Sequence, residues 1–141
     1  MRSSKPILLV EDDNVDATMV RRALKDLNVP NGIIHQLDGK DALKYLRSSD
    51  NKKRPCVILL DLNMPGMNGI DFLKIIKNDD ELKQIPVIVL TTSKNDQDKM
   101  NSFEFSAAGY IIKSADYKEF VEALKILNLY WTLSELPYPG A

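Results

Sequence analysis

Four short, uninterrupted apolar runs and one weaker run, at residues 33–37, alternate along this chain with segments whose apolar residues recur at helical spacing. The runs occupy residues 6–10, 33–37, 56–60, 87–90 and 110–112. The helical patterns occupy residues 15–28, about 42–46, 70–78, about 95–107 and 117–131. Asn14 can cap the first of these helices, and the fourth is weakly amphipathic through Met100, Phe103 and Ala107. A strand that is apolar on both faces is typical of a parallel sheet covered by helices on both sides. The alternation therefore predicts one α/β domain in which right-handed crossovers join parallel strands.

Size and charge limit the classes of function. A chain of 141 residues with a formal net charge of −1 has the length of a single domain and lacks the basic excess expected for nucleic-acid or membrane-surface binding. Its single cysteine excludes an internal disulfide and is typical of a reducing compartment. No apolar stretch approaches the roughly 20 residues of a membrane span. We expect a cytoplasmic protein that binds neither nucleic acid nor membrane.

Polar side chains follow four of the five apolar runs. Glu11 and Asp12 follow the first, Asp61 the third, Thr91 the fourth and Lys113 the fifth. A flavodoxin-like, doubly wound (βα)5 sheet of strand order 2-1-3-4-5 makes strands 1 and 3 neighbours where the strand order reverses. Ligands bind at that point, beyond the carboxyl ends of the strands. We therefore expect the three carboxylates to meet in one crevice, with Thr91 beside it and Lys113 beyond.

Three carboxylates in one crevice repel one another, which raises their pKa values or attracts a cation. A hard divalent ion with oxygen ligands is the simplest remedy, and Mg²⁺ (or Mn²⁺) is the expected cofactor. Asp12 and Asp61 can supply side-chain oxygens, and Glu11 can act directly or through water. Asn63 can add its backbone carbonyl as the loop after Asp61 curls back.

The same arrangement suits phosphoryl transfer. A carboxylate such as Asp61 is a competent nucleophile toward phosphorus. The charge on the transferred phosphoryl oxygens needs positive partners and hydrogen-bond donors, which the Lys113 ammonium and the Thr91 hydroxyl can supply. Each residue alone has an ordinary interpretation: helix-terminus charge for Glu11 and Asp12, a turn for Asp61 and Thr91, a surface lysine for Lys113. Their joint placement after strands 1, 3, 4 and 5 favours the functional interpretation.

Four segments resemble the motifs of response-regulator receiver domains of two-component systems. They are LLVEDD at 8–13, LLDLNMPGMNG at 59–69, LTTS at 90–93 and IIK at 111–113. The resemblance implies that Asp61 is the phosphoacceptor and that Lys113 binds the phosphate. It also implies that Thr91 and Tyr110 form a switch that reads out phosphorylation. A protein of this kind catalyses only its own phosphotransfer and slow dephosphorylation, and is not otherwise an enzyme.

Receiver domains usually carry a proline after the lysine, often with a cis peptide bond, whereas this chain has Ser114. The geometry of the Lys113–Ser114 peptide is therefore left open by the sequence. The Lys-Ser pair and the tail at 130–137 are similar to the single-domain response regulators that serve bacterial, notably cyanobacterial, phytochromes. This narrower resemblance implies a sensor histidine kinase of the phytochrome type as the partner.

The last helical segment carries more apolar residues than one buried face requires. Ile126, Leu129, Tyr130 and Leu133 lie outside the stripe that would cover the sheet, and exposed apolar patches usually mark a contact. We expect a receiver domain over 6–128 and a C-terminal extension over 129–141. We also expect a homodimer through the fourth helix, fifth strand (with Tyr110) and fifth helix. The alternative is that residues 136–139 fold back over the chain's own helix.

Two other functions remain open at this point. An aspartyl-phosphate phosphatase would be expected to resemble Asp-x-Asp at the nucleophile, and Asn63 stands where its second aspartate would be. A phosphorylation-independent pseudo-receiver would bind partners without chemistry, which the intact acids, Thr91 and Lys113 disfavour.

Overall fold

Strands and helices alternate in the computed structural model as the sequence predicts. The structure describes residues 5–48, 54–64, 66–92, 95–114 and 116–133, without the side chains of 96 and 129–133. The elements in chain order are β1 (Ile7–Val10), α1 (Asn14–Asp26), β2 (Ile33–Gln36), α2 (Gly39–Ser48), β3 (Val57–Leu60), α3 (Gly69–Lys77), β4 (Val87–Thr91), α4 (Asp96–Glu104), β5 (Gly109–Ile112) and α5 (Tyr117–Leu133).

The five strands form one parallel sheet in the order β2-β1-β3-β4-β5, which confirms the flavodoxin-like prediction. Val10 pairs with Leu60, so the residues that follow β1 and β3 emerge side by side. The backbone N–H of Asp61 donates to the carbonyl of Val10 at 3.0 Å, which extends the pairing by one residue. Toward the β5 edge of the sheet, Thr91 at the end of β4 pairs with Ile112 at the end of β5. The register thus aligns the carboxyl ends of the strands that carry the candidate site.

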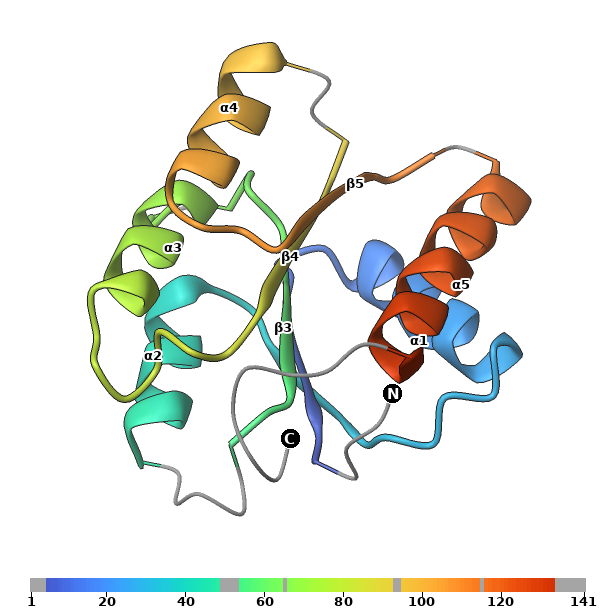
Figure 1. Ribbon diagram of the computed structural model, residues 1–141, viewed down its shortest axis with the longest axis horizontal. Helices are drawn as coiled ribbons and strands as arrows, with labels where there is room; N and C mark the ends of the chain where they lie inside the picture. Colours follow the sequence, from blue (N-terminus) through green and yellow to red (C-terminus); the bar gives the residue numbers. More distant parts are fainter. Residues whose placement is uncertain (1–4, 49–53, 65, 93–94, 115, 134–141) are drawn as a thin grey trace.

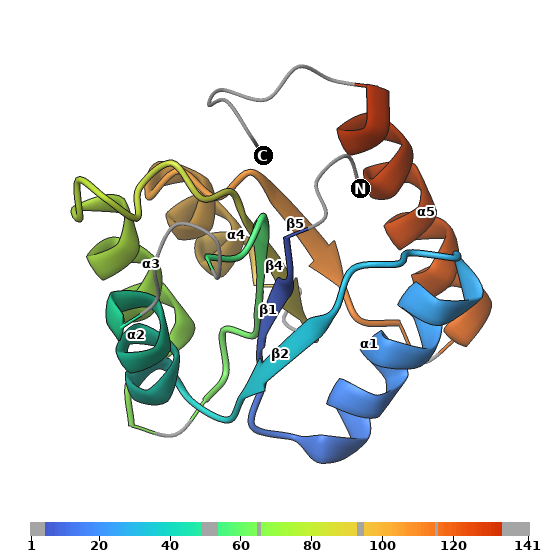
Figure 2. The ribbon, with the colours of Figure 1, turned by 90° about the horizontal axis from the view of Figure 1, so that it is seen from below.

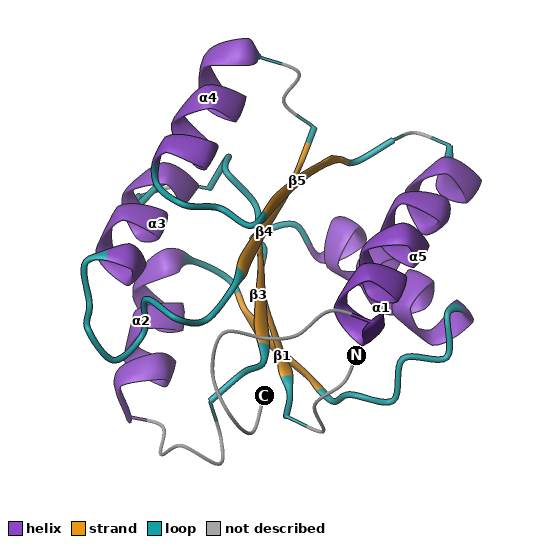
Figure 3. Ribbon diagram, viewed as in Figure 1, coloured by secondary structure: helices purple, strands orange, loops and turns teal. Residues whose placement is uncertain are grey.

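Helices cover both faces of the sheet (Figures 1 and 2): α1 and α5 lie on one face and α2, α3 and α4 on the other. Figure 3 shows the strands enclosed between these two helical layers. Alternate residues of each central strand enter the two cores. Leu8 and Val10 pack with the α2 and α3 side, and Ile7 and Leu9 pack with α1 and α5. This two-sided burial explains why the central strands read as continuous apolar runs.

Two local expectations need correction. The N-cap of α1 is Asp13, one residue before Asn14, because the Asp13 carboxylate accepts from the backbone N–H groups of Val15 and Asp16. In α4, Met100 and Phe103 were expected on the apolar side of a weakly amphipathic helix, but their exposed fractions are 64% and 48%. The packing of α4 against the rest of the domain therefore does not use those two side chains.

In α5, the structure confirms the predicted exposure of one apolar residue, Ile126. Phe120 and Leu124 are buried against the sheet, whereas Ile126 is 68% exposed. The side chains of Leu129, Tyr130 and Leu133 and the segment 134–141 lie outside the described residues, so the extension and its dimer contact stay predictions. None of the helices in the described part of the chain combines the length and apolarity that a membrane span requires.

Candidate functional site

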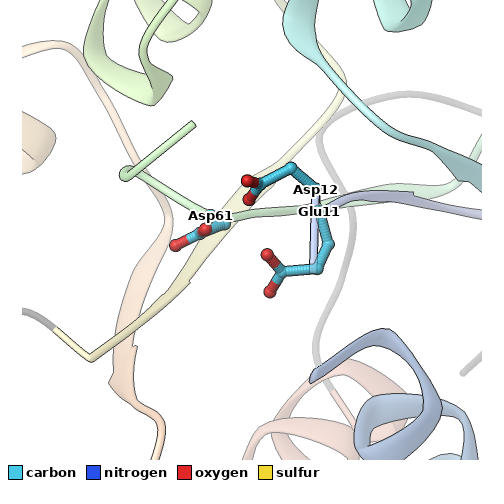
Figure 4. Close-up of side chains that lie close together, drawn as sticks. All are labelled: Glu11, Asp12 and Asp61. Carbon is cyan, nitrogen blue, oxygen red and sulfur yellow. The ribbon is translucent and has the colours of Figure 1, made fainter. Parts of the chain in front are cut away.

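Three carboxylates converge beyond the carboxyl ends of β1 and β3. Glu11, Asp12 and Asp61 each offer an oxygen within 4.8 Å of the others, and Figure 4 shows the side chains projecting to the same side of the strand ends. Glu11 and Asp61 are buried, with exposed fractions of 2% and 7%, while Asp12 is exposed. The convergence of carboxylates predicted at the reversal of strand order is therefore present.

Lys113 reaches into this cluster from the end of β5. Its ammonium group contacts the Glu11 carboxylate, lies 2.8 Å from Asp16 Oδ2 and lies 3.9 Å from Asp61 Oδ1. Only 8% of the residue is exposed. A buried lysine keeps its charge only when anions surround it, so Lys113 and the carboxylates stabilise one another. Lys113 thus belongs to the cluster itself, although the sequence placed it only beyond Thr91.

Asp16 is the site residue that sequence reasoning missed. It lies in the first turn of α1, where an acidic residue ordinarily complements the helix dipole. The cap at Asp13 fixes the start of α1, and Asp16 one turn into the helix lies 2.8 Å from the Lys113 ammonium group. The available signal in the sequence was the pair Asp13 and Asp16, three residues apart at a helix start. This spacing does not reveal that Lys113, 97 positions further along the chain, is the partner of Asp16.

Burial dominates the electrostatics of the carboxylates. It raises the pKa of Glu11 to about 8, although the hydrogen bond from Lys113 opposes the shift. Burial also raises the pKa of Asp61, against the effects of Glu11 and Lys113. For Lys113, burial lowers the pKa, but the hydrogen bonds to Asp16 and Glu11 and the charge of Asp61 outweigh it, and the pKa is raised. The cluster therefore favours an additional positive charge, whether a proton or a metal ion.

The start of α3 lies in close contact with the backbone of Asp61 and Leu62. A Cβ at Gly69 would lie 2.6 Å from the Asp61 carbonyl oxygen and 2.6 Å from Leu62 Cα, so only glycine fits. The N–H of Gly69 donates to the Leu62 carbonyl at 2.9 Å. Asn68 caps α3 by accepting from the N–H of Asp71 at 2.9 Å. Helix α3 thus begins directly against the backbone of Asp61.

The switch residues occupy the predicted strands. Thr91 is fully buried at the end of β4, and the Asn63 side-chain amide lies 3.5 Å from its hydroxyl oxygen. The backbone N–H of Lys113 donates to the Thr91 carbonyl at 2.7 Å, which ties β5 to β4 beside the cluster. Tyr110 is half-buried in β5 and packs against the core on the face of the sheet that α2, α3 and α4 cover.

The Lys113–Ser114 peptide bond is trans. Ser114 also has local hydrogen bonds that a proline could not make. Its hydroxyl accepts from the Asp116 N–H at 3.0 Å and donates to Glu119 at 3.0 Å. Asp116 in turn accepts from the N–H groups of Lys118 and Glu119, which begins α5. Ser114 therefore helps to cap the last helix.

The donor set fits a hard divalent cation. Glu11, Asp12 and Asp61 present only carboxylate oxygens, which are the ligands that Mg²⁺ and Mn²⁺ prefer. The exposed position of Asp12 leaves one side of the group accessible to solvent. Burial, which raises the pKa of Glu11 to about 8, leaves its ionised carboxylate poorly solvated.

Comparison with known proteins identifies the family. The model of the response regulator receiver domain matches residues 7–125, which is most of the chain. The chain belongs to the response regulator receiver family. This confirms the resemblance carried by the four sequence motifs, and the fold and the cluster at Asp61 agree with it.

The narrower resemblance is also confirmed. This receiver is 37% identical over 140 residues to the response regulator Rcp1 of Synechocystis, with 97% of this chain and 95% of Rcp1 covered. It is similar to the phosphorylated cyanobacterial phytochrome response regulator RcpA (38% identity, TM-score 0.85, 95% and 99% covered). The Mn²⁺-bound form of Rcp1 is similar to the same extent (37% identity, TM-score 0.83, 95% and 99% covered). The chain is thus a relative of phytochrome response regulators.

Proposed function

We propose that this receiver accepts a phosphoryl group on Asp61 from the phosphohistidine of a partner sensor histidine kinase. An oxygen of the Asp61 carboxylate attacks the phosphorus, the phosphorus–nitrogen bond breaks, and the imidazole nitrogen leaves with its electron pair. The observation that carries the proposal is the convergence of Lys113 and two further acids on a carboxylate at a strand end. Burial of Asp61 keeps its carboxylate poorly solvated, which favours attack once a cation balances its charge.

Each residue around Asp61 has a role in the proposal. Glu11, Asp12, Asp61 and the Asn63 carbonyl would hold Mg²⁺ or Mn²⁺, which would supply positive charge near the phosphoryl oxygens. Lys113 would release part of its contact with Glu11 and Asp16 and donate to a phosphoryl oxygen instead. The movement that this exchange requires is short, because Lys113 Nζ already lies 3.9 Å from Asp61 Oδ1.

Thr91 and Tyr110 would transmit the change. A phosphoryl group on Asp61 favours any hydroxyl donor that can reach it, so Thr91 moves toward the group and leaves space behind it. Tyr110, which already packs against the core, would turn into that space. Such a movement biases an equilibrium between two conformations that exist before phosphorylation.

The output surface would be the face formed by α4, β5 and α5. Met100, Phe103, Ile112 and Ile126 are exposed on these elements, which supports a homodimer contact there. Kinship with phytochrome response regulators supports a phytochrome-type kinase as the phosphodonor. Asn63 offers no strong acid or base for water activation, so we propose slow dephosphorylation and no turnover of an external substrate. Such a protein would work in the cytoplasm, where sensor kinases present their phosphohistidine.

The test is phosphoryl uptake from acetyl phosphate, measured by intact-protein mass spectrometry with and without Mg²⁺. Wild-type protein should gain one phosphoryl group only when the cation is present. The Asp61→Asn variant should gain none, because an amide is not a nucleophile toward phosphorus. Equal uptake by both proteins would refute Asp61 as the acceptor and leave the pseudo-receiver as the better interpretation.

A further inference from the structure

A hollow of about 850 Å³ lies between α2 and α3, on the face of the sheet opposite α1 and α5. Both views of the ribbon show these two helices side by side (Figures 1 and 2). Half-buried Met67 and Ile75 and buried Leu43 line it, which gives the hollow an apolar floor. Met67 lies close over the start of α2, since a Cβ at Gly39 would meet the Met67 sulfur at 3.0 Å.

The rim of the hollow is basic. Lys40, Lys44 and Arg47 recur at intervals of four and three residues along α2, so they share one side of the helix. All three are exposed, and the acidic residue that lines the hollow with them is Asp41. The charge of the lining is therefore positive, although the whole chain carries a formal net charge of −1.

We propose that this α2–α3 hollow is a docking groove for an acidic amphipathic helix of a partner protein. Apolar anchors on one side of such a helix would pack on Leu43, Met67 and Ile75, and glutamates beside them would face Lys40 and Lys44. This is the helix-in-groove form of recognition, in which apolar residues three and four positions apart enter a groove. The open, exposed rim suits a segment of a macromolecule better than an enclosed small molecule. The residues that line the groove include neither Asp61 nor any residue of α4, β5 or α5.

The test uses a synthetic helical peptide with leucines at i, i+3, i+4 and i+7 and glutamates on the flanks. Titration into ¹⁵N-labelled, unphosphorylated protein should shift the amide signals of α2, Met67 and α3. Isothermal titration calorimetry gives the affinity. The unphosphorylated protein is used so that the result does not depend on chemistry at Asp61.

The discriminating variant is Lys40→Glu/Lys44→Glu. Lys40 lies in the first turn of α2, where glutamate is compatible with the helix dipole, so the variant should remain folded. Reversing two rim charges should weaken binding about tenfold, since tenfold corresponds to roughly 1.4 kcal/mol and two close charge pairs are reversed. The matched control, Lys118→Glu/Lys125→Glu, reverses two exposed lysines of α5 and should change the affinity less than about twofold.

Three outcomes would overturn the proposal. Equal weakening in both double variants would show attraction to net charge alone. If a peptide with glutamine in place of glutamate bound equally well, charge complementarity with the basic rim would not contribute to binding. Amide signal shifts confined to other elements would place the binding site elsewhere. Binding of anionic lipid vesicles but not of the peptide would identify a membrane surface, not a protein helix, as the partner.

Discussion

Replacement of Gly69 by alanine tests the packing that positions Asp61. A methyl group at this position would lie 2.6 Å from the Asp61 carbonyl oxygen and 2.6 Å from Leu62 Cα. Both are backbone atoms beside a strand that is buried on both faces, so neither can move aside as the end of a side chain could. Forced overpacking of this kind costs about 1–3 kcal/mol, more than the fraction of a kcal/mol that alanine gains over glycine at a helix start.

The expected result is a lower melting temperature and slower phosphorylation. A loss of about 2 kcal/mol would lower the midpoint by roughly 4–10 °C for a domain of this size. Relief of the clash must displace the start of α3 or the backbone of Asp61, so phosphoryl uptake from acetyl phosphate should slow as well. Differential scanning calorimetry and the uptake assay measure the two effects on the same sample.

Two other glycines provide the controls. A Cβ at Gly32 meets no atom within 4 Å, so Gly32→Ala should leave stability and uptake unchanged. At Gly39 the nearest atom is the flexible Met67 side chain, so alanine there should have an intermediate effect on stability. If Gly69→Ala were as stable and as active as Gly32→Ala, the proposed constraint on the Asp61 loop would be wrong.

The remaining predictions concern charge at the site. Lys113→Gln should reduce the rate of phosphoryl uptake by about 100-fold, because it removes one preorganised donor to the phosphoryl oxygens. An uptake rate equal to that of the wild type would exclude this role for Lys113. Asp12→Asn should weaken Mg²⁺ binding at least about tenfold in calorimetric titration. The control Asp13→Asn keeps a side chain that can cap α1 and should bind Mg²⁺ normally. Equal losses of affinity in the two variants would contradict the assignment of Asp12 as a ligand. Without divalent ions, the free energy of unfolding should fall as pH rises from about 4.5 to about 8, because the folded state retains the Glu11 proton and the unfolded state does not. Denaturant titrations should find this slope reduced in Glu11→Gln, and an unchanged slope would show that another group is responsible.

The sequence predicts the sheet and most of the cluster because strand ends are easy to recognise. Apolar runs that stop at Glu11 and Asp61 place those acids beyond strands whose order follows from crossover rules. The position of Lys113 relative to Thr91 is less predictable, since it depends on how a flexible side chain extends from the last strand. Its contacts with Glu11 and Asp16 depend on how the end of β1 and the start of α1 lie relative to the end of β5.

Other features depend on three-dimensional packing that periodicity does not encode. Met100 and Phe103 match a helical stripe, yet they are exposed because α4 buries other residues, including Ser102. The α2–α3 groove joins residues from two helices and a loop, so no single segment reveals it. The cap at Asp13 in place of Asn14 is a one-residue difference between two good capping residues, which composition alone does not resolve.

The most direct test of the central claim locates the acyl phosphate within the chain. Protein phosphorylated with acetyl phosphate and Mg²⁺ is reduced with borohydride, which converts an aspartyl phosphate to homoserine, and the digested peptides are sequenced by tandem mass spectrometry. The proposal predicts homoserine at position 61 and at no other aspartate, including Asp12 beside it. Homoserine at another position, or phosphoryl uptake without any homoserine, would contradict the assignment of Asp61 as the phosphoacceptor.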